Sequence, residues 1–192
     1  IGVGTALVEC GMVKVAEPYT ELKLDTAAGV VTLKIKVSGQ KAETVSFVNA
    51  PAFMLRSQET VDTKEYGKVT VDIGYGGNFY AIVDVQAVGL DLKRENYRSL
   101  IDAGNLLKTY INEQLPVVHP EKPFINETTH IEFIGPSDTP GVYNKDAVVF
   151  PPGDIDRSPC GTGTSARCAQ LVAEGKLRVG ESFVHESFIG SL

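Results

Sequence analysis

Tryptophan is absent from this chain of 192 residues, and cysteine and histidine are scarce, with three of each. The histidines are His119, His130 and His185. No C-x-x-C or H-x-x-x-H pair occurs, so the spacing predicts no metal site. Three cysteines without a disulfide framework are typical of a reducing compartment, and we expect a cytoplasmic protein.

Long apolar runs are also missing, as is any excess of positive charge. No segment approaches the roughly eighteen apolar residues that a membrane-spanning helix needs, and we expect no secretory leader. The net charge of −6 and the absence of a basic stripe argue against binding to nucleic acid or to acidic membranes. With 43% hydrophobic residues, the chain can form one large domain or two small ones.

One stretch, residues 153–175, carries the strongest chemical signal. Pro159 suits the turn that starts a helix, and Gly175 is typical of the residue just past a helix end. Cys160 is therefore predicted at a helix N-terminus, where the helix dipole can lower a thiol pKa from about 8.5 to about 3.5–7.5. The N–H groups of Gly161 and Thr162 would remain open to a carboxylate.

Small residues occupy nearly every face of this predicted helix over two turns. Such a helix suits a position enclosed by strands, because a surface helix normally has one polar and one apolar face. The alternative is a packing helix with inert, buried cysteines. The polar loop from Asp156 to Cys160 favours chemistry over packing alone.

Residues 1–11 echo the same helix. When Ile1 is aligned with Ser165, Leu7-Val8 falls on Leu171-Val172 and Gly11 falls on Gly175. There is no initiator Met, and the counterpart of Cys160 would lie five positions before Ile1. An internal repeat of this kind predicts two similar halves related by a pseudo-twofold axis.

Most of the remaining sequence has the alternation of strands, and one segment has helical spacing. Strands are predicted at 31–37, 42–48, 68–73, 78–83, 128–134, 141–150 and 178–186. A helix is predicted from Asn96 to Leu115, ended by Pro116. Residues 117–126 are the best linker candidate. Gly76-Gly77 is either an ordinary hairpin turn or a close approach of the backbone to a ligand.

Four segments resemble the proline racemase family, which includes hydroxyproline epimerases. The run Asp156-Arg-Ser-Pro-Cys-Gly-Thr-Gly-Thr-Ser-Ala-Arg resembles the second cysteine motif of the family. Ile1–Gly11 is similar to the continuation of its first motif, Met-Cys-Gly-His-Gly. Residues 47–53 and 66–81 are also similar to family segments. The resemblance covers essentially the whole chain, which looks like the middle portion of a longer enzyme.

The resemblance implies an α+β fold like that of diaminopimelate epimerase. Two pseudo-symmetric halves would each form a β-barrel around a central helix. We expect residues 1–116 to belong to the N-terminal half and residues 117–192 to the C-terminal half. The resemblance also implies a homodimer.

The family's reaction, as implied here, inverts the α-carbon of proline without a cofactor or a metal. One cysteine thiolate removes the α-proton and a second, protonated cysteine delivers a proton to the opposite face. Cys160 would be one of these groups, and Gly161 and Thr162 would hold the substrate carboxylate. Asp156 would bind the ammonium group, and Phe150 would line the ring pocket. The alternatives are a loop or cap role for Asp156 and a core role for Phe150.

Several alternatives remain open at the level of sequence. Cysteine at position 160 favours a racemase or epimerase over the related dehydratases, which carry threonine there. Proline and 4-hydroxyproline are both possible substrates. Since the first cysteine motif is missing, we expect the 192-residue chain alone to be inactive, as an amino-acid-binding or structural piece. A cysteine hydrolase would need a histidine partner, and no local signature supplies one.

Overall fold

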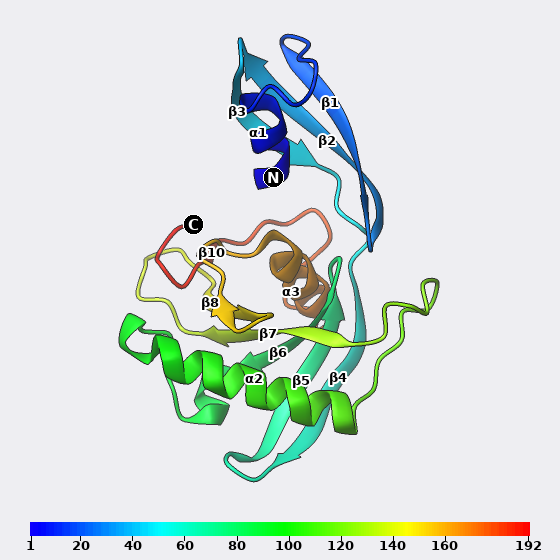
Figure 1. The fold of residues 1–192 in the computed structure, drawn as a ribbon. Helices are drawn as coiled ribbons and strands as arrows, with labels where there is room; N and C mark the ends of the chain where they lie inside the picture. The colour runs from blue at the N-terminus through cyan, green and yellow to red at the C-terminus, as the bar shows by residue number, and fades with distance from the viewer. The chain divides into compact units, whose positions relative to one another are not determined.

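The computed structural model describes residues 1–192 and separates them into two units, Ile1–Ala50 and Pro51–Leu192 (Figure 1). The sequence predicts a boundary between residues 116 and 117, whereas these units meet between Ala50 and Pro51. Residues 117–126 instead lie inside the second unit, where they connect a helix to the next strand of the same sheet. The assignment of segments to halves of a longer enzyme stays a prediction.

The first unit combines a short helix with a three-stranded antiparallel sheet. Its elements are α1 (Gly2–Glu9), β1 (Tyr19–Thr26), β2 (Gly29–Ser38) and β3 (Lys41–Phe47). The predicted hairpin is present as β2 and β3. In α1, a Cβ added to Gly4 would lie 2.8 Å from Leu33 Cδ1, so the helix backbone lies directly on β2. The core of the unit is formed by Val8, Leu33, Ile35 and Val37.

The second unit contains a seven-stranded sheet, and its central order is β10-β8-β7-β6-β5-β4, with β9 paired to β8. Its strands are β4 (Phe53–Thr63), β5 (Gly67–Tyr75), β6 (Phe79–Asp84), β7 (Thr128–Gly135), β8 (Asn144–Phe150), β9 (Asp154–Ile155) and β10 (His185–Glu186). Its helices are η1 (Val85–Val88), η2 (Arg94–Asn96), α2 (Tyr97–Gln114) and α3 (Gly161–Ala173). The parallel pair β6–β7 needs a crossover connection, and α2 lies within it.

Successive residues of a strand point to opposite faces of the sheet, and two neighbours in β8 show which helix covers which face. Val149 faces α2, because a Cβ added to Gly104 would lie 2.8 Å from its side chain. Val148 instead packs in a cluster with Cys160 and Ala166 beside α3. The helices α2 and α3 therefore cover opposite faces of this sheet, so strands such as β6 and β8 are buried on both sides.

The helix α3 lies with its backbone against β5. A Cβ added to Gly76 would lie 2.1 Å from the carbonyl oxygen of Thr162 and 2.8 Å from the amide nitrogen of Ala166. Toward the other end of the helix, Gln170 Nε2 donates a hydrogen bond to Asp72 Oδ2 of β5 at 2.5 Å. The sequence left two roles open for Gly76, an ordinary turn or a close approach to a ligand. In the structure, the close approach is to the backbone of α3.

The burial of α3 differs from the predicted enclosure on all sides. Its buried residues are Gly163, Ala166, Arg167, Gln170 and Leu171. These positions follow the spacing i, i+3, i+4, i+7, i+8, which is the stripe of a helix covered along one side. Within this chain, the small residues of α3 serve close backbone approach to the sheet.

Most predicted elements are confirmed, and the structure shows a mixed fold of helices and sheets. The predicted strand 178–186 is much shorter, since only His185–Glu186 pairs with β8. No helix of the chain is both long and apolar enough to cross a membrane.

Candidate active site

Cys160 is the N-cap residue of α3, as the sequence predicts. A short chain of hydrogen bonds shapes the loop before it. The N–H of Ser158 donates to Asp156 Oδ1 at 2.8 Å, and the N–H of Cys160 donates to Ser158 Oγ at 3.0 Å. Cys160 has a φ of 55°, a conformation that non-glycine residues rarely adopt and that costs about 1–3 kcal/mol. The surrounding loop therefore holds the thiol in a strained but defined position.

Side chains from the three central strands meet α3 on the same face of the sheet. Alternation places Tyr80 of β6, His130 and Glu132 of β7, and Phe150 of β8 on this face. Tyr80 is fully buried, and its Oη lies 3.4 Å from Cys160 Sγ and 2.6 Å from Thr162 Oγ1. Tyr80 thereby contacts both the sulfur predicted as an acid–base group and the first turn of the helix.

The two residues predicted to bind a carboxylate begin α3. Gly161 is exposed, and a Cβ added there would meet no atom within 4 Å. The Thr162 hydroxyl is hydrogen-bonded to Tyr80, so the backbone N–H of Thr162 is the group that could bind an anion. The first N–H groups of an α-helix have no intrahelical partner, so this end of α3 has the chemistry of an anion site.

The protonation of Cys160 differs from the sequence expectation. Burial raises the pKa of its thiol to about 11, against the lowering effects of the Tyr80 hydroxyl and the Gly163 N–H. The negative charges of Glu132 and Asp156 raise the pKa further. In this chain the loss of hydration outweighs the helix N-terminus, so Cys160 is a thiol near neutral pH.

Aromatic rings extend from the thiol to Phe150. The centroids of the Tyr80 and His130 rings are 4.8 Å apart, and His130 stacks on Phe150 at 6.5 Å. Burial lowers the pKa of His130 to about 4, and the charge of Lys108 adds to this effect. His130 is therefore a neutral ring near neutral pH. Phe150 is half-buried on the face that carries Cys160.

His119 lies among aromatic side chains on another part of the sheet. Its ring contacts Phe53, Tyr75 and Phe79, with the closest centroid, that of Tyr75, 4.6 Å away. Its Nδ1 accepts hydrogen bonds from the following backbone N–H groups of Glu121 and Lys122. These contacts indicate a structural role for His119.

Asp156 performs the loop role that sequence analysis kept as an alternative, because Oδ1 accepts the Ser158 N–H. Its carboxylate also lies close enough to influence Cys160, since its charge raises the thiol pKa. One oxygen therefore shapes the loop while the carboxylate as a whole contributes negative charge beside the sulfur. A structural role and a role in binding an ammonium group are compatible in this geometry.

Three buried titratable groups near α3 were not predicted. Glu132, Asp146 and His185 each place one atom that could ligate a metal ion within 4.8 Å of the others. His185 Nε2 is 3.5 Å from Asp146 Oδ1. Both carboxylates lack hydrogen-bond partners. Spacing in the sequence could not reveal this group, because its members come from β7, β8 and β10.

Burial determines the protonation of these groups. Desolvation raises the pKa of Glu132 to about 7, opposed by the positive charge of Arg167. It raises the pKa of Asp146 to about 9, and the charge of Glu132 adds to the effect. Desolvation lowers the pKa of His185 to about 4. Near neutral pH, a protonated Asp146 next to a neutral imidazole avoids an uncompensated buried charge.

This burial predicts that the protein loses stability as the pH rises above about 6.5. A carboxyl group with a raised pKa binds more protons in the folded state than in the unfolded state. Its contribution to the free energy of unfolding is therefore complete at low pH and is lost as the pH rises through the folded pKa. His130 and His185 have lowered pKa values and act in the opposite direction, but only below about pH 6.5. Between about pH 6.5 and 8.5, Asp146 keeps its proton in the folded state but has lost it in the unfolded state. This difference alone corresponds to a fall of about 2–3 kcal/mol in the free energy of unfolding across that range.

Urea unfolding at both pH values measures this fall. Asp146→Asn imitates the protonated carboxyl and should remove most of the pH dependence, whereas the exposed control Asp138→Asn should keep it. A pH dependence that is unchanged in Asp146→Asn would show that Asp146 does not hold a proton in the folded state.

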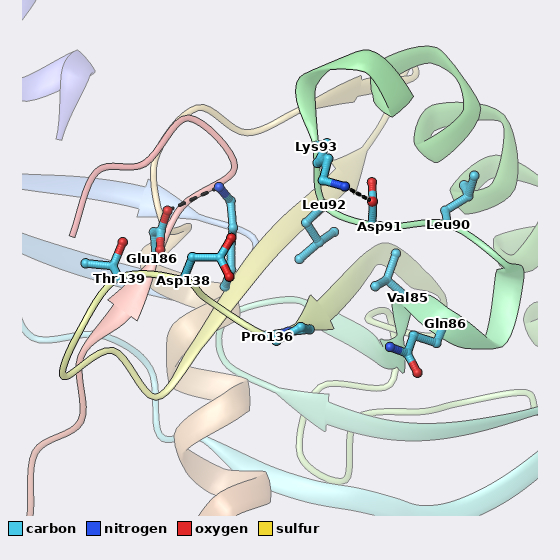
Figure 2. Close-up of a pocket in the computed structure, with 11 residues that line it drawn as sticks. Val85, Gln86, Leu90, Asp91, Leu92, Lys93, Pro136, Asp138, Thr139 and Glu186 are labelled. Atoms are coloured by element: carbon cyan, nitrogen blue, oxygen red, sulfur yellow. Dashed lines mark hydrogen bonds and ion pairs between the residues drawn. The ribbon is translucent and has the colours of Figure 1, made fainter.

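A separate cavity of about 320 Å³ lies beside η1 and the segment that precedes η2 (Figure 2). Four of its charged side chains form two ion pairs, with Lys93 Nζ 2.6 Å from Asp91 Oδ2 and Lys145 Nζ 3.1 Å from Glu186 Oε1. None of the residues predicted for the active site lines this cavity. The Cys160 region therefore remains the candidate active site.

Comparison with known proteins identifies several relatives. The model of the family described as proline racemase matches residues 1–192. A 4-hydroxyproline 2-epimerase from Streptosporangium roseum is 45% identical over 191 residues, which are 100% of this chain and 57% of the relative. Proline racemase A from Trypanosoma cruzi is 45% identical over 195 residues, covering 98% of this chain and 46% of the relative.

Solved structures agree with this result. A hydroxyproline epimerase from Agrobacterium vitis, with bound trans-4-OH-L-proline, matches with a TM-score of 0.88 and 39% identity. The match covers 100% of this chain and 55% of the solved one. The present chain thus spans about half the length of the relatives it matches. By sequence and by fold, it belongs to the proline racemase family.

Proposed function

We propose that this chain is part of a cofactor-independent amino-acid racemase or epimerase, and that Cys160 is one of its two acid–base groups. The observation that carries the proposal is the position of Cys160, a buried thiol at the start of α3 that contacts Tyr80 and lies near Asp156. Relatives named as proline racemase and 4-hydroxyproline epimerase support the reaction class.

Inversion of an α-carbon requires a proton to leave one face and another to arrive at the opposite face. A cysteine thiolate takes the α-proton, the electron pair of the broken C–H bond passes toward the carboxylate, and a thiol on the other face protonates the carbon. After one turnover, each sulfur has exchanged its protonation state with the other. A raised pKa makes Cys160 the proton donor of this pair in the resting chain.

The remaining roles follow from the surroundings of Cys160. Backbone N–H groups of Gly161 and Thr162 would bind the substrate carboxylate and stabilise the negative charge that develops there. Asp156 would pair with the substrate ammonium group, and Phe150 would form one wall for the apolar ring. The substrate class is proline or 4-hydroxyproline, since relatives carry both names.

The second acid–base cysteine is proposed to lie outside these 192 residues. Cys168 belongs to the same helix as Cys160, eight residues further along α3, so the two sulfurs cannot lie on opposite faces of one substrate. A longer enzyme with two pseudo-symmetric barrel halves, each around a central helix as in diaminopimelate epimerase, would supply the partner. We also propose a cytoplasmic homodimer for the longer enzyme.

Chiral chromatography of L-proline and trans-4-hydroxy-L-proline, each incubated with the full-length protein, tests the proposal. Inversion of either substrate is expected, and the faster reaction identifies the substrate. The 192-residue chain alone should invert neither, because it carries one of the two required cysteines. If the full-length protein inverts neither amino acid, the proposed reaction is wrong, and a non-catalytic amino-acid-binding role becomes the better description.

A further inference from the structure

The Tyr80 hydroxyl lies between two groups that the proposed reaction uses. Its Oη is 3.4 Å from Cys160 Sγ and 2.6 Å from Thr162 Oγ1, and in both pairs either atom can be the donor. Tyr80 itself is fully buried, so bulk water does not compete for its hydroxyl. A phenol has one proton to donate and can also accept a hydrogen bond. A single hydroxyl therefore connects the sulfur with the start of α3.

We propose that Tyr80 is a positioning residue for Cys160, and that its hydroxyl stabilises both protonation states of the sulfur by reversing the direction of its hydrogen bonds. This inference rests on the proposed acid–base function of Cys160. Beside a thiolate, Thr162 donates to Tyr80 and Tyr80 donates to the sulfur. Beside a thiol, the sulfur donates to Tyr80 and Tyr80 donates to Thr162.

Such a reversible link suits a group that must be an acid in one direction of the reaction and a base in the other. A lysine or arginine would favour only the thiolate, and a carboxylate would favour only the thiol. Tyr80 does not take the proton itself, because burial and the nearby Cys160 raise its pKa well above the usual value of a phenol. The proton that leaves or reaches the sulfur is therefore exchanged with the substrate.

The geometry leaves little freedom for Tyr80. A Cβ added to Gly163 would lie 3.2 Å from three atoms at once, namely Cys160 Sγ, Glu132 Oε2 and Tyr80 Cε1. The His130 ring packs on the other side, with its centroid 4.8 Å from that of Tyr80. These contacts keep the phenol aimed at the sulfur while the glycine leaves room for it.

Several charged and titratable groups surround Cys160. Tyr80 of β6, Glu132 of β7 and Asp156 of the preceding loop act on the thiol itself. His130 lies beside Tyr80, and Asp146 and Arg167 interact with Glu132. Glu132 and Asp156 disfavour the thiolate by their charge. The Tyr80 hydroxyl can pair with either form of the sulfur, but its hydrogen bond to the charged thiolate is the stronger one, so its net effect is to lower the thiol pKa. Loss of this hydroxyl should therefore make Cys160 a weaker acid.

The thiolate of Cys160 can be measured without any catalytic assay. Its alkylation by iodoacetamide is followed from about pH 7 to 9 by mass spectrometry of the peptide that contains it, in the full-length protein and in Tyr80→Phe. A hydrogen bond to a charged group corresponds to about one pKa unit, so the thiolate fraction should fall about tenfold in Tyr80→Phe. Because a more basic thiolate is also more nucleophilic, the alkylation rate should fall about threefold.

Tyr75→Phe is a matched control. Tyr75 is also buried, in the neighbouring strand β5, and its hydroxyl has no hydrogen-bond partner. Its removal should leave alkylation of Cys160 unchanged. Equal rates in Tyr80→Phe and the unchanged protein would overturn the inference, as would an equal decrease in Tyr75→Phe. Thermal unfolding of each variant shows whether it is folded at the assay temperature.

Kinetics separate this inference from the proposed function. In the full-length enzyme, Tyr80→Phe should reduce kcat about tenfold in both directions of inversion, with KM nearly unchanged, because Tyr80 acts through Cys160. If Cys160→Ser loses inversion but Tyr80→Phe keeps the original kcat, the function stands and the role of Tyr80 is wrong. If Cys160→Ser keeps full activity, the proposed function itself fails.

Discussion

Replacement of Cys160 by serine should reduce inversion by the full-length enzyme by about a thousandfold or more, because general acid–base groups contribute about 10²–10⁴ in rate. A serine hydroxyl is a far weaker acid than a thiol, so it can neither deliver nor accept the α-proton at a useful rate near neutral pH. Its similar size should preserve the packing of Cys160 against Val148 and Ala166. Initial rates from each enantiomer measure the effect.

Cys168→Ser provides the control within the same helix. Cys168 is a free, half-buried cysteine of α3, and it has no place in the proposed chemistry. Its replacement should leave the inversion rate within about twofold of the original. Comparable losses in both variants would mean that α3 tolerates no substitution, and the loss in Cys160→Ser would then say nothing about chemistry.

Gly76→Ala should destabilise the protein by about 3 kcal/mol or more, which exceeds the usual cost of overpacking because a backbone atom is in the way. The added Cβ would lie 2.1 Å from the carbonyl oxygen of Thr162, so β5 and α3 would have to separate. Cys160 and Tyr80 would then lose their contact across the same interface. Urea unfolding measures the stability, and alkylation of Cys160 reports the local displacement.

Gly74→Ala is the matched control for this effect. Gly74 lies in β5, two residues before Gly76, and faces the same helix. A Cβ there would meet Met54 Sδ at 3.2 Å and both Cβ and the carbonyl oxygen of Ala166 at 3.3 Å. These distances demand shifts of only a few tenths of an ångström, and the cost should be about 1 kcal/mol. Equal stabilities of the two variants would contradict the close approach of α3 to β5.

Local patterns in the sequence were sufficient to locate most of the fold. Alternation predicted β2, β5, β6 and β7, and helical spacing together with Pro116 predicted α2. The division of the chain could not be found in this way. Residues 117–126 contain two prolines and look like a linker, but they lie in the crossover that joins the parallel neighbours β6 and β7 of one sheet.

The candidate site was predicted where its residues are close in sequence. Asp156, Cys160, Gly161 and Thr162 lie within seven residues, and turn and helix-start signals were enough to predict their positions. Tyr80 and Glu132 were missed because strand pairing alone brings β6 and β7 to the start of α3. Alternation could have assigned each to a face of its strand, but not to the face that α3 covers.

The pKa of Cys160 is the clearest case in which local reasoning was wrong. A helix N-terminus favours a thiolate, and the sequence supports that expectation. Desolvation by burial and the charge of Glu132 depend on the packed sheet, and they raise the pKa to about 11 although the Tyr80 hydroxyl acts in the opposite direction. Long-range packing therefore reverses the direction expected from the helix alone.

The central claim is that Cys160 exchanges a proton with the α-carbon on one face of the substrate. The most direct measurement is the incorporation of deuterium at the α-carbon in D₂O by the full-length enzyme and by Cys160→Ser, with L- and D-substrate supplied separately. We expect the unchanged enzyme to form an inverted product that carries solvent deuterium at the α-carbon. The variant should lose inversion, and it should also lose deuterium exchange at the α-carbon of at least one enantiomer. Inversion without solvent deuterium, or equal exchange from both enantiomers in Cys160→Ser, would contradict the assignment of Cys160.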